Sequence, residues 1–84
     1  MNILLVDDDI VDRKMIRRSL VKGGIEHHLT EVSTVEEGIF ALEELCFDLL
    51  LLDYNMPSKN GVDLLIELKR INHIKDLTIV MISN

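Results

Sequence analysis

The sequence predicts an α/β protein built on a parallel sheet. Short apolar segments typical of buried strands alternate strictly with segments of helical period, in the order strand, helix, strand, helix, strand, helix, strand. Two of the strand segments, residues 3–6 and 47–52, are rich in consecutive aliphatic residues, as in strands covered on both faces. Right-handed crossovers would give the strand order 2-1-3-4, with the first helix on one face and the other two on the opposite face.

Composition and charge limit the chain to one small soluble domain. Of its 84 residues, 48% are hydrophobic and 29% charged, a balance that excludes intrinsic disorder. The formal net charge of −6 disfavours binding to nucleic acid or to anionic membranes. No apolar run approaches the roughly 18 residues needed to span a bilayer, and the acidic triplet at 7–9 follows residues 3–6 too closely for a signal peptide. We therefore expect a cytoplasmic protein.

The first half of the chain predicts two strands and two helices. After the strand at residues 3–6, apolar residues recur at helical spacing up to Leu20, and two glycines at 23 and 24 end that helix. The basic residues between them, Arg13, Lys14, Arg17 and Arg18, are interpreted as a solvated face. A weak strand follows at 28–32. Ser33 or Thr34 is then expected to cap a second helix, whose apolar stripe consists of Val35, Ile39, Leu42 and Leu45.

The second half predicts a central strand, a helix and a last strand. The leucine run at 47–52 is short and is followed by Asp53 and then Pro57, which favours a strand over a helix. A third helix is expected over residues 61–72 and a fourth strand over 77–82. Cys46, the single cysteine, lies between apolar neighbours and is expected to be a small buried residue.

Carboxylates follow two of the predicted strands. Asp7, Asp8 and Asp9 end the first strand and Asp53 ends the third. In parallel sheets ligands bind beyond the carboxyl ends of the strands, so neighbouring strands one and three would bring these groups together. Their mutual repulsion would favour a hard divalent cation such as Mg²⁺. The alternative is that the triplet only caps the helix and Asp53 only begins a turn.

Three segments carry a resemblance to a known family. Leu4-Leu5-Val6-Asp7-Asp8-Asp9, Leu51-Leu52-Asp53-Tyr54-Asn55-Met56-Pro57 followed by Gly61, and Ile79-Val80-Met81-Ile82-Ser83 resemble the receiver domain of two-component response regulators. The stretch from Glu37 to Leu42 is similar to the family's second helix. The resemblance implies a flavodoxin-like three-layer sandwich, of which residues 1–84 would be a partial receiver domain lacking the fifth strand, the last helices and any output domain.

The resemblance also implies a role for individual residues. The chain would be a phosphoacceptor switch rather than a conventional enzyme, taking a phosphoryl group from a sensor histidine kinase or a histidine phosphotransfer protein. Asp53 would accept the phosphoryl group, and Ser83 would contact it through its hydroxyl. Asp7, Asp8, Asp53 and the backbone carbonyl of Asn55 would hold Mg²⁺, with Asp9 accessory.

The sequence departs from the family in three respects, and two alternatives follow. It stops before the family's lysine and aromatic residue on a fifth strand, and Asn84 stands where a small residue is usual. One alternative is a non-catalytic fragment that associates with another chain through the exposed strand at 77–82. A haloacid-type phosphatase is disfavoured because that chemistry needs an aspartate two residues after the nucleophile, where this chain has Asn55.

Overall fold

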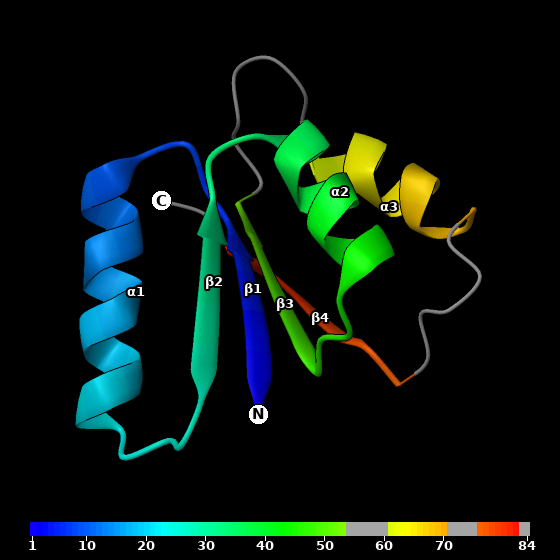
Figure 1. Ribbon diagram of the computed structural model, residues 1–84. Coiled ribbons are helices and arrows are strands. Elements are labelled where there is room, and N and C mark those ends of the chain that lie inside the picture. Colours follow the sequence, from blue (N-terminus) through cyan, green and yellow to red (C-terminus); the bar gives the residue numbers. More distant parts are fainter. Residues whose placement is uncertain (54–60, 71–75, 83–84) are drawn as a thin grey trace.

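The structure, a computed structural model, describes residues 1–53, 61–70 and 76–82. In these residues the elements are β1 (Asn2–Val6), α1 (Ile10–Lys22), β2 (His28–Val32), α2 (Val35–Glu44), β3 (Leu49–Asp53), α3 (Gly61–Leu68) and β4 (Thr78–Ile82). The strands are parallel and lie in the order β2-β1-β3-β4. Helix α1 lies on one side of the sheet, and α2 and α3 lie on the other (Figure 1). The predicted fold class, strand order and placement of the helices are therefore confirmed.

The core lies between the sheet and the α2–α3 layer. Leu4 pairs with Leu50 and Val6 with Leu52, so these four side chains share one face of the sheet. All four are fully buried, and Leu64 of α3 is buried with them. The continuous apolar runs of β1 and β3 are thus the centre of the sheet, as their composition predicts.

Helix α2 begins with a reciprocal cap. The hydroxyl oxygen of Thr34 accepts a hydrogen bond from the backbone N–H of Glu37 at 3.1 Å. The Glu37 carboxylate reaches back and accepts from the hydroxyls of Ser33 and Thr34, at 3.0 and 3.1 Å. These contacts lower the pKa of Glu37, with the Ser33 hydroxyl as the largest cause. Thr34 is therefore the cap among the two predicted candidates.

Helix α3 is shorter than predicted. It ends at Leu68, whereas the expected end at residue 72 lies outside the described residues. The backbone N–H groups of Lys69 and Arg70 donate to carbonyls three residues earlier, at Ile66 and Glu67. Such tightened hydrogen bonds are typical of the last turn of a helix.

Helix α1 is covered only in part, because Ile10, Val11 and Met15 are more than half exposed and α1 has no fully buried residue. Two expectations about burial are wrong. Leu45, expected in the apolar stripe of the second helix, is 54% exposed. Cys46 is exposed. Helix α2 already ends at Glu44 and the next residue, Leu45, is extended, so Cys46 lies in a connection beyond the buried face of the helix.

The last strand is also more open than its composition suggests. Ile79, Val80 and Met81 are 39%, 42% and 37% exposed, although β4 is apolar throughout its centre. In the described sheet β4 pairs with β3 alone and forms an edge. Separately, no helix among the described residues is long and apolar enough to cross a membrane.

Candidate functional site

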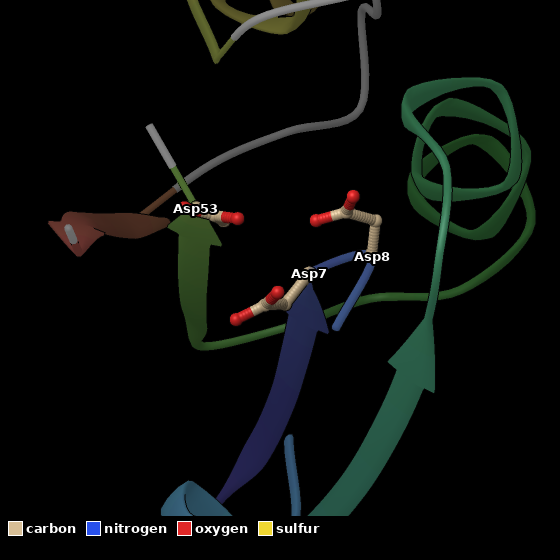
Figure 2. A group of neighbouring side chains, drawn as sticks. All are labelled: Asp7, Asp8 and Asp53. Carbon is tan, nitrogen blue, oxygen red and sulfur yellow. The ribbon is translucent and has the colours of Figure 1, made fainter. Parts of the chain in front are cut away.

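Three carboxylates meet at the carboxyl ends of β1 and β3. Val6 pairs with Leu52, so Asp7, which follows β1, and Asp53, the last residue of β3, stand at the same edge of the sheet. Asp8 extends from the turn after β1 toward Asp53 (Figure 2). One carboxylate oxygen from each of the three residues lies within 4.8 Å of those of the other two. The predicted convergence of Asp7, Asp8 and Asp53 is present in the structure.

Asp7 is held by backbone contacts on both sides. Its N–H donates to the carbonyl of Val32 on β2 at 3.1 Å, which extends the β1–β2 pairing by one residue. Its Oδ1 accepts a hydrogen bond from the backbone N–H of Asp9 at 2.9 Å. The residue is only 1% exposed. Asp7 is therefore a fixed, buried member of the cluster, whereas Asp8 is exposed.

Asp9 has a different role from Asp7 and Asp8. Its Oδ1 accepts from the N–H of Val11 at 2.8 Å, and its carbonyl accepts from the N–H of Arg13 at 3.1 Å. These bonds make Asp9 the N-cap of α1. The capping alternative is thus correct for Asp9, which is not one of the three converging carboxylates.

The surroundings of Asp7 disfavour its ionised form. Burial, the largest cause, and the negative charges of Asp53 and Asp12 together raise the pKa of the Asp7 carboxyl from its ordinary value of 3.8 to about 6, against a lowering effect of the hydrogen bond from the Asp9 backbone. Asp12, in the first turn of α1, therefore contributes to the electrostatic potential at the site. A cation bound among these carboxylates would be stabilised, because its positive charge relieves their mutual repulsion.

The arrangement fits a divalent cation. Oδ2 of Asp7 is buried and has no hydrogen-bond partner among the described residues, so one lone-pair acceptor inside the cluster is available to an ion. The other donors are carboxylate oxygens, the ligands that Mg²⁺ prefers, and the exposed side at Asp8 leaves room for the waters that Mg²⁺ retains. The residues present therefore suit Mg²⁺ chemically.

Two predicted site residues lie outside the described part of the chain. These are Asn55, whose backbone carbonyl was expected to bind the metal, and Ser83, the expected hydroxyl donor. Asn84 and Pro57 lie outside it as well. Their roles stay predictions from the resemblance.

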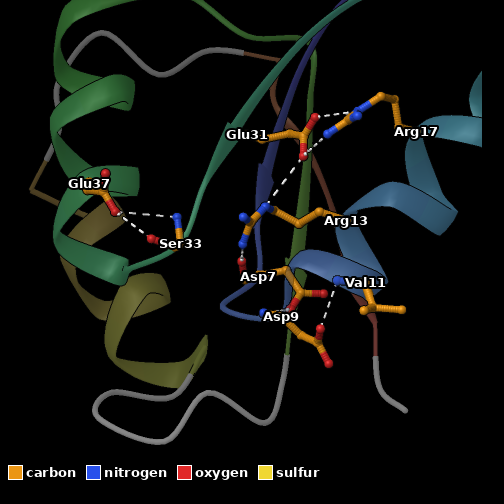
Figure 3. Close-up of polar contacts among 8 residues, drawn as sticks. All are labelled: Asp7, Asp9, Val11, Arg13, Arg17, Glu31, Ser33 and Glu37. Atoms are coloured by element: carbon orange, nitrogen blue, oxygen red, sulfur yellow. Dashed lines mark hydrogen bonds and ion pairs between the residues drawn. The ribbon is translucent and has the colours of Figure 1, made fainter.

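Arg13 is a residue of the site that the sequence analysis missed. Its side chain is 15% exposed, so the predicted solvated face of α1 is wrong at this position. Nη1 of Arg13 donates to the backbone carbonyl of Asp7 at 2.6 Å, and Nε lies 3.4 Å from Glu31 of β2 (Figure 3). One feature of the sequence could have identified Arg13. It lies in the second turn of the helix that Asp9 caps, directly beside the acidic turn.

Comparison with known proteins agrees with this geometry. The family model "Response regulator receiver domain" matches residues 3–84. Over 87 residues the chain is 34% identical to "Chemotaxis protein CheY1" of Helicobacter pylori strain J99, and 37% identical to "Two-component response regulator ORR3" of Oryza sativa subsp. indica. Both alignments include 99% of this chain, and they span 67% and 63% of the two relatives.

Solved structures show the same fold. The response regulator protein TrrA from Thermotoga maritima, in complex with Mg²⁺ and BeF, superposes with a TM-score of 0.82 at 26% identity. That alignment covers 98% of this chain and 68% of the TrrA chain. The strand order, the acidic cluster and the match over residues 3–84 lead to one conclusion: the chain belongs to the response regulator receiver domain family, whose members are signalling switches.

Proposed function

We propose that this chain is the phosphoacceptor part of a two-component response regulator, and that Asp53 receives the phosphoryl group. The observation that carries the proposal is the convergence of Asp7, Asp8 and Asp53 within 4.8 Å at the carboxyl edge of a parallel sheet. Asp53 is the last residue of the central strand β3 and is 5% exposed. It pairs with Ile82 of β4, and Leu52 before it pairs with Val6 of β1. A nucleophile on such a strand is held in one orientation.

The transfer is a displacement at phosphorus. A carboxylate oxygen of Asp53 attacks the phosphorus of a phosphohistidine on the kinase or phosphotransfer protein, and a P–O bond forms. The P–N bond breaks, and its electron pair stays on the imidazole nitrogen of the donor, which then takes up a proton. The product is an acyl phosphate on Asp53, and hydrolysis of this bond would return the domain to its resting state.

A cation in the cluster would neutralise charge on the phosphoryl oxygens and on the carboxylates around them. We propose Mg²⁺ as that cation, held by Asp7, Asp8, Asp53 and the backbone carbonyl of Asn55. Asp7 would contribute the buried oxygen and Asp8 the exposed one. Ser83 is proposed to donate its hydroxyl to a phosphoryl oxygen, as the family resemblance implies.

Phosphorylation by a small-molecule donor tests the proposal directly. Acetyl phosphate with Mg²⁺ should add one phosphoryl group to the wild-type chain, detected as intact mass, and base treatment should remove it. Asp53→Asn should show no addition. Asp48→Asn is the matched control, because Asp48 precedes the same strand at the opposite edge of the sheet, where it accepts from the backbone N–H of Asn2. A phosphoryl group retained in Asp53→Asn would refute the assignment of the acceptor.

The proposed partner is a sensor histidine kinase or a histidine phosphotransfer protein. Such donors draw their phosphoryl group from ATP, so the proposal places the domain in the cytoplasm. The chain spans about two thirds of the length of the curated relatives described above.

A second candidate function is association through β4. The strand is an edge in the described sheet, and Ile79, Val80 and Met81 are partly exposed there. Unpaired backbone groups next to apolar side chains favour pairing with another strand. We propose that a second copy of the chain pairs at this edge.

A further inference from the structure

An arginine and a glutamate connect the acidic turn to the neighbouring strand. Nη1 of Arg13 donates to the backbone carbonyl of Asp7 at 2.6 Å, and Nε of the same guanidinium lies 3.4 Å from Oε1 of Glu31 on β2. One guanidinium thus bridges the end of β1 and the body of β2 (Figure 3). Of the four basic residues expected to be solvated on α1, Arg13 is the one that makes this bridge in the structure.

The bridge acts on the peptide group that joins Asp7 to Asp8. The N–H of Asp7 is already fixed by the carbonyl of Val32, and the Arg13 bond fixes its carbonyl. Both ends of the residue are therefore tied to β2, one directly and the other through Glu31. The carbonyl of Asp7 belongs to the same planar peptide as the nitrogen of Asp8, so fixing that carbonyl limits the direction in which the Asp8 side chain leaves the backbone.

We propose that Arg13, anchored by Glu31, is a positioning residue that orients Asp7 and Asp8 for a divalent cation. This inference rests on the proposed function, since it assumes that the acidic cluster binds Mg²⁺. The guanidinium is suited to the task because its planar fork reaches two acceptors at once. Partners that orient metal ligands in this way typically contribute on the order of tenfold or more in affinity.

The same helix supplies a matched control. Arg17, one turn further along α1, binds the same Glu31 carboxylate with two hydrogen bonds of 2.7 and 2.9 Å, and its side chain is 49% exposed. In the described part of the chain, both hydrogen bonds of Arg17 go to Glu31 and neither goes to Asp7. Replacing Arg17 removes an ion pair to Glu31 and a positive charge while leaving the bond to the Asp7 carbonyl in place.

The test is a calorimetric titration of the wild type, Arg13→Gln, Arg13→Lys and Arg17→Gln with Mg²⁺. Arg13→Gln should raise the Mg²⁺ dissociation constant on the order of tenfold, which means weaker binding. Arg13→Lys should fall between it and the wild type, because an ammonium keeps the charge without the fork. Arg17→Gln should bind as the wild type does. Unfolding in chelator should show how much stability each variant loses without metal, which separates folding from metal binding.

The direction of the change distinguishes orientation from charge. Removing a positive charge beside carboxylates would by itself strengthen the binding of a cation, so weaker binding in Arg13→Gln reports lost orientation. Binding as tight as in the wild type, or tighter, in either Arg13 variant would overturn the inference. If Arg13→Gln does not fold, Arg13→Lys decides by the same criterion. If the wild type binds no Mg²⁺, the proposed metal site is overturned as well. If the wild type binds Mg²⁺ and is phosphorylated on Asp53, and the Arg13 variants bind Mg²⁺ equally tightly, only this inference is overturned.

Discussion

Gly38 of α2 lies so close to Val6 of β1 that a β-carbon at position 38 would be 3.0 Å from Cγ2 of Val6. Real β-carbon contacts are essentially never shorter, so the helix rests on the strand at a distance that suits glycine. Val6 directly precedes Asp7. The close contact therefore lies beneath the strand end that carries the acidic cluster.

Gly38→Ala should destabilise the protein. The added methyl group must displace the fully buried Val6, and overpacking of this kind costs about 1–3 kcal/mol. Alanine recovers up to about 1 kcal/mol through its higher helix propensity, so the net free energy of unfolding should still fall. Urea denaturation measures the change. Glu43→Ala, at an exposed position of the same helix, should stay near wild type. Equal or higher stability of Gly38→Ala would contradict the close packing.

The stability of the metal-free protein should fall as the pH rises from about 4 to about 6. The pKa of Asp7 is raised to about 6 in the folded protein from an ordinary value of 3.8, so over this interval the folded state keeps a proton that the unfolded state loses. The stabilisation that this proton provides is complete at low pH and is lost as the pH passes the folded pKa.

The difference in stability between wild type and Asp7→Asn isolates this effect. Glu31 and Glu37, whose pKa values are lowered chiefly by hydrogen bonds from Arg17 and Ser33, produce the opposite trend at lower pH in both proteins and cancel in the difference. Chemical denaturation in chelator at several pH values gives the measurement. A difference that stays constant across this interval would show that Asp7 titrates normally.

Mg²⁺ should raise the melting temperature of the wild type. A cation that binds only the folded state stabilises it by mass action and relieves repulsion among Asp7, Asp8 and Asp53. Asp8→Asn should reduce this shift and should raise the melting temperature in chelator, because it removes one repelling charge. Asp48→Asn is the control at the other edge of the sheet and should respond to Mg²⁺ as the wild type does. An undiminished shift in Asp8→Asn would remove Asp8 from the metal site.

The chain should associate in solution through β4. Light scattering should show an average mass that rises with concentration in the low micromolar range. Val80→Lys places a charge on the edge strand and should shift the equilibrium toward the monomer. Val21→Lys is the matched control, since Val21 is 68% exposed on α1, and it should leave the association unchanged. A wild type that remains monomeric with cooperative unfolding would refute the proposal.

Much of the fold could be predicted from local patterns. The aliphatic runs that became β1 and β3 lie at the centre of the sheet, where β1 is buried on both faces and β3 is buried at Leu50 and Leu52. The period of α2 identified Val35 and Leu42 as buried. Strand order followed from the handedness of crossovers, a property of chain chirality rather than of individual residues. The convergence of Asp7 with Asp53 then followed from that order.

Only the tertiary structure decided which side chains of α1 are covered and which contacts they make. The sequence predicts that the basic residues of α1 are solvated, yet Arg13 is largely covered against Asp7 and Glu31, whereas the apolar Met15 is 61% exposed. The sequence by itself determined the order of elements and the strand ends at which charges collect, because those depend on short-range patterns and chain handedness. The bridge from Arg13 to a carbonyl of β1 and a carboxylate of β2 depends on distances between elements, which only the packed sheet and helix establish.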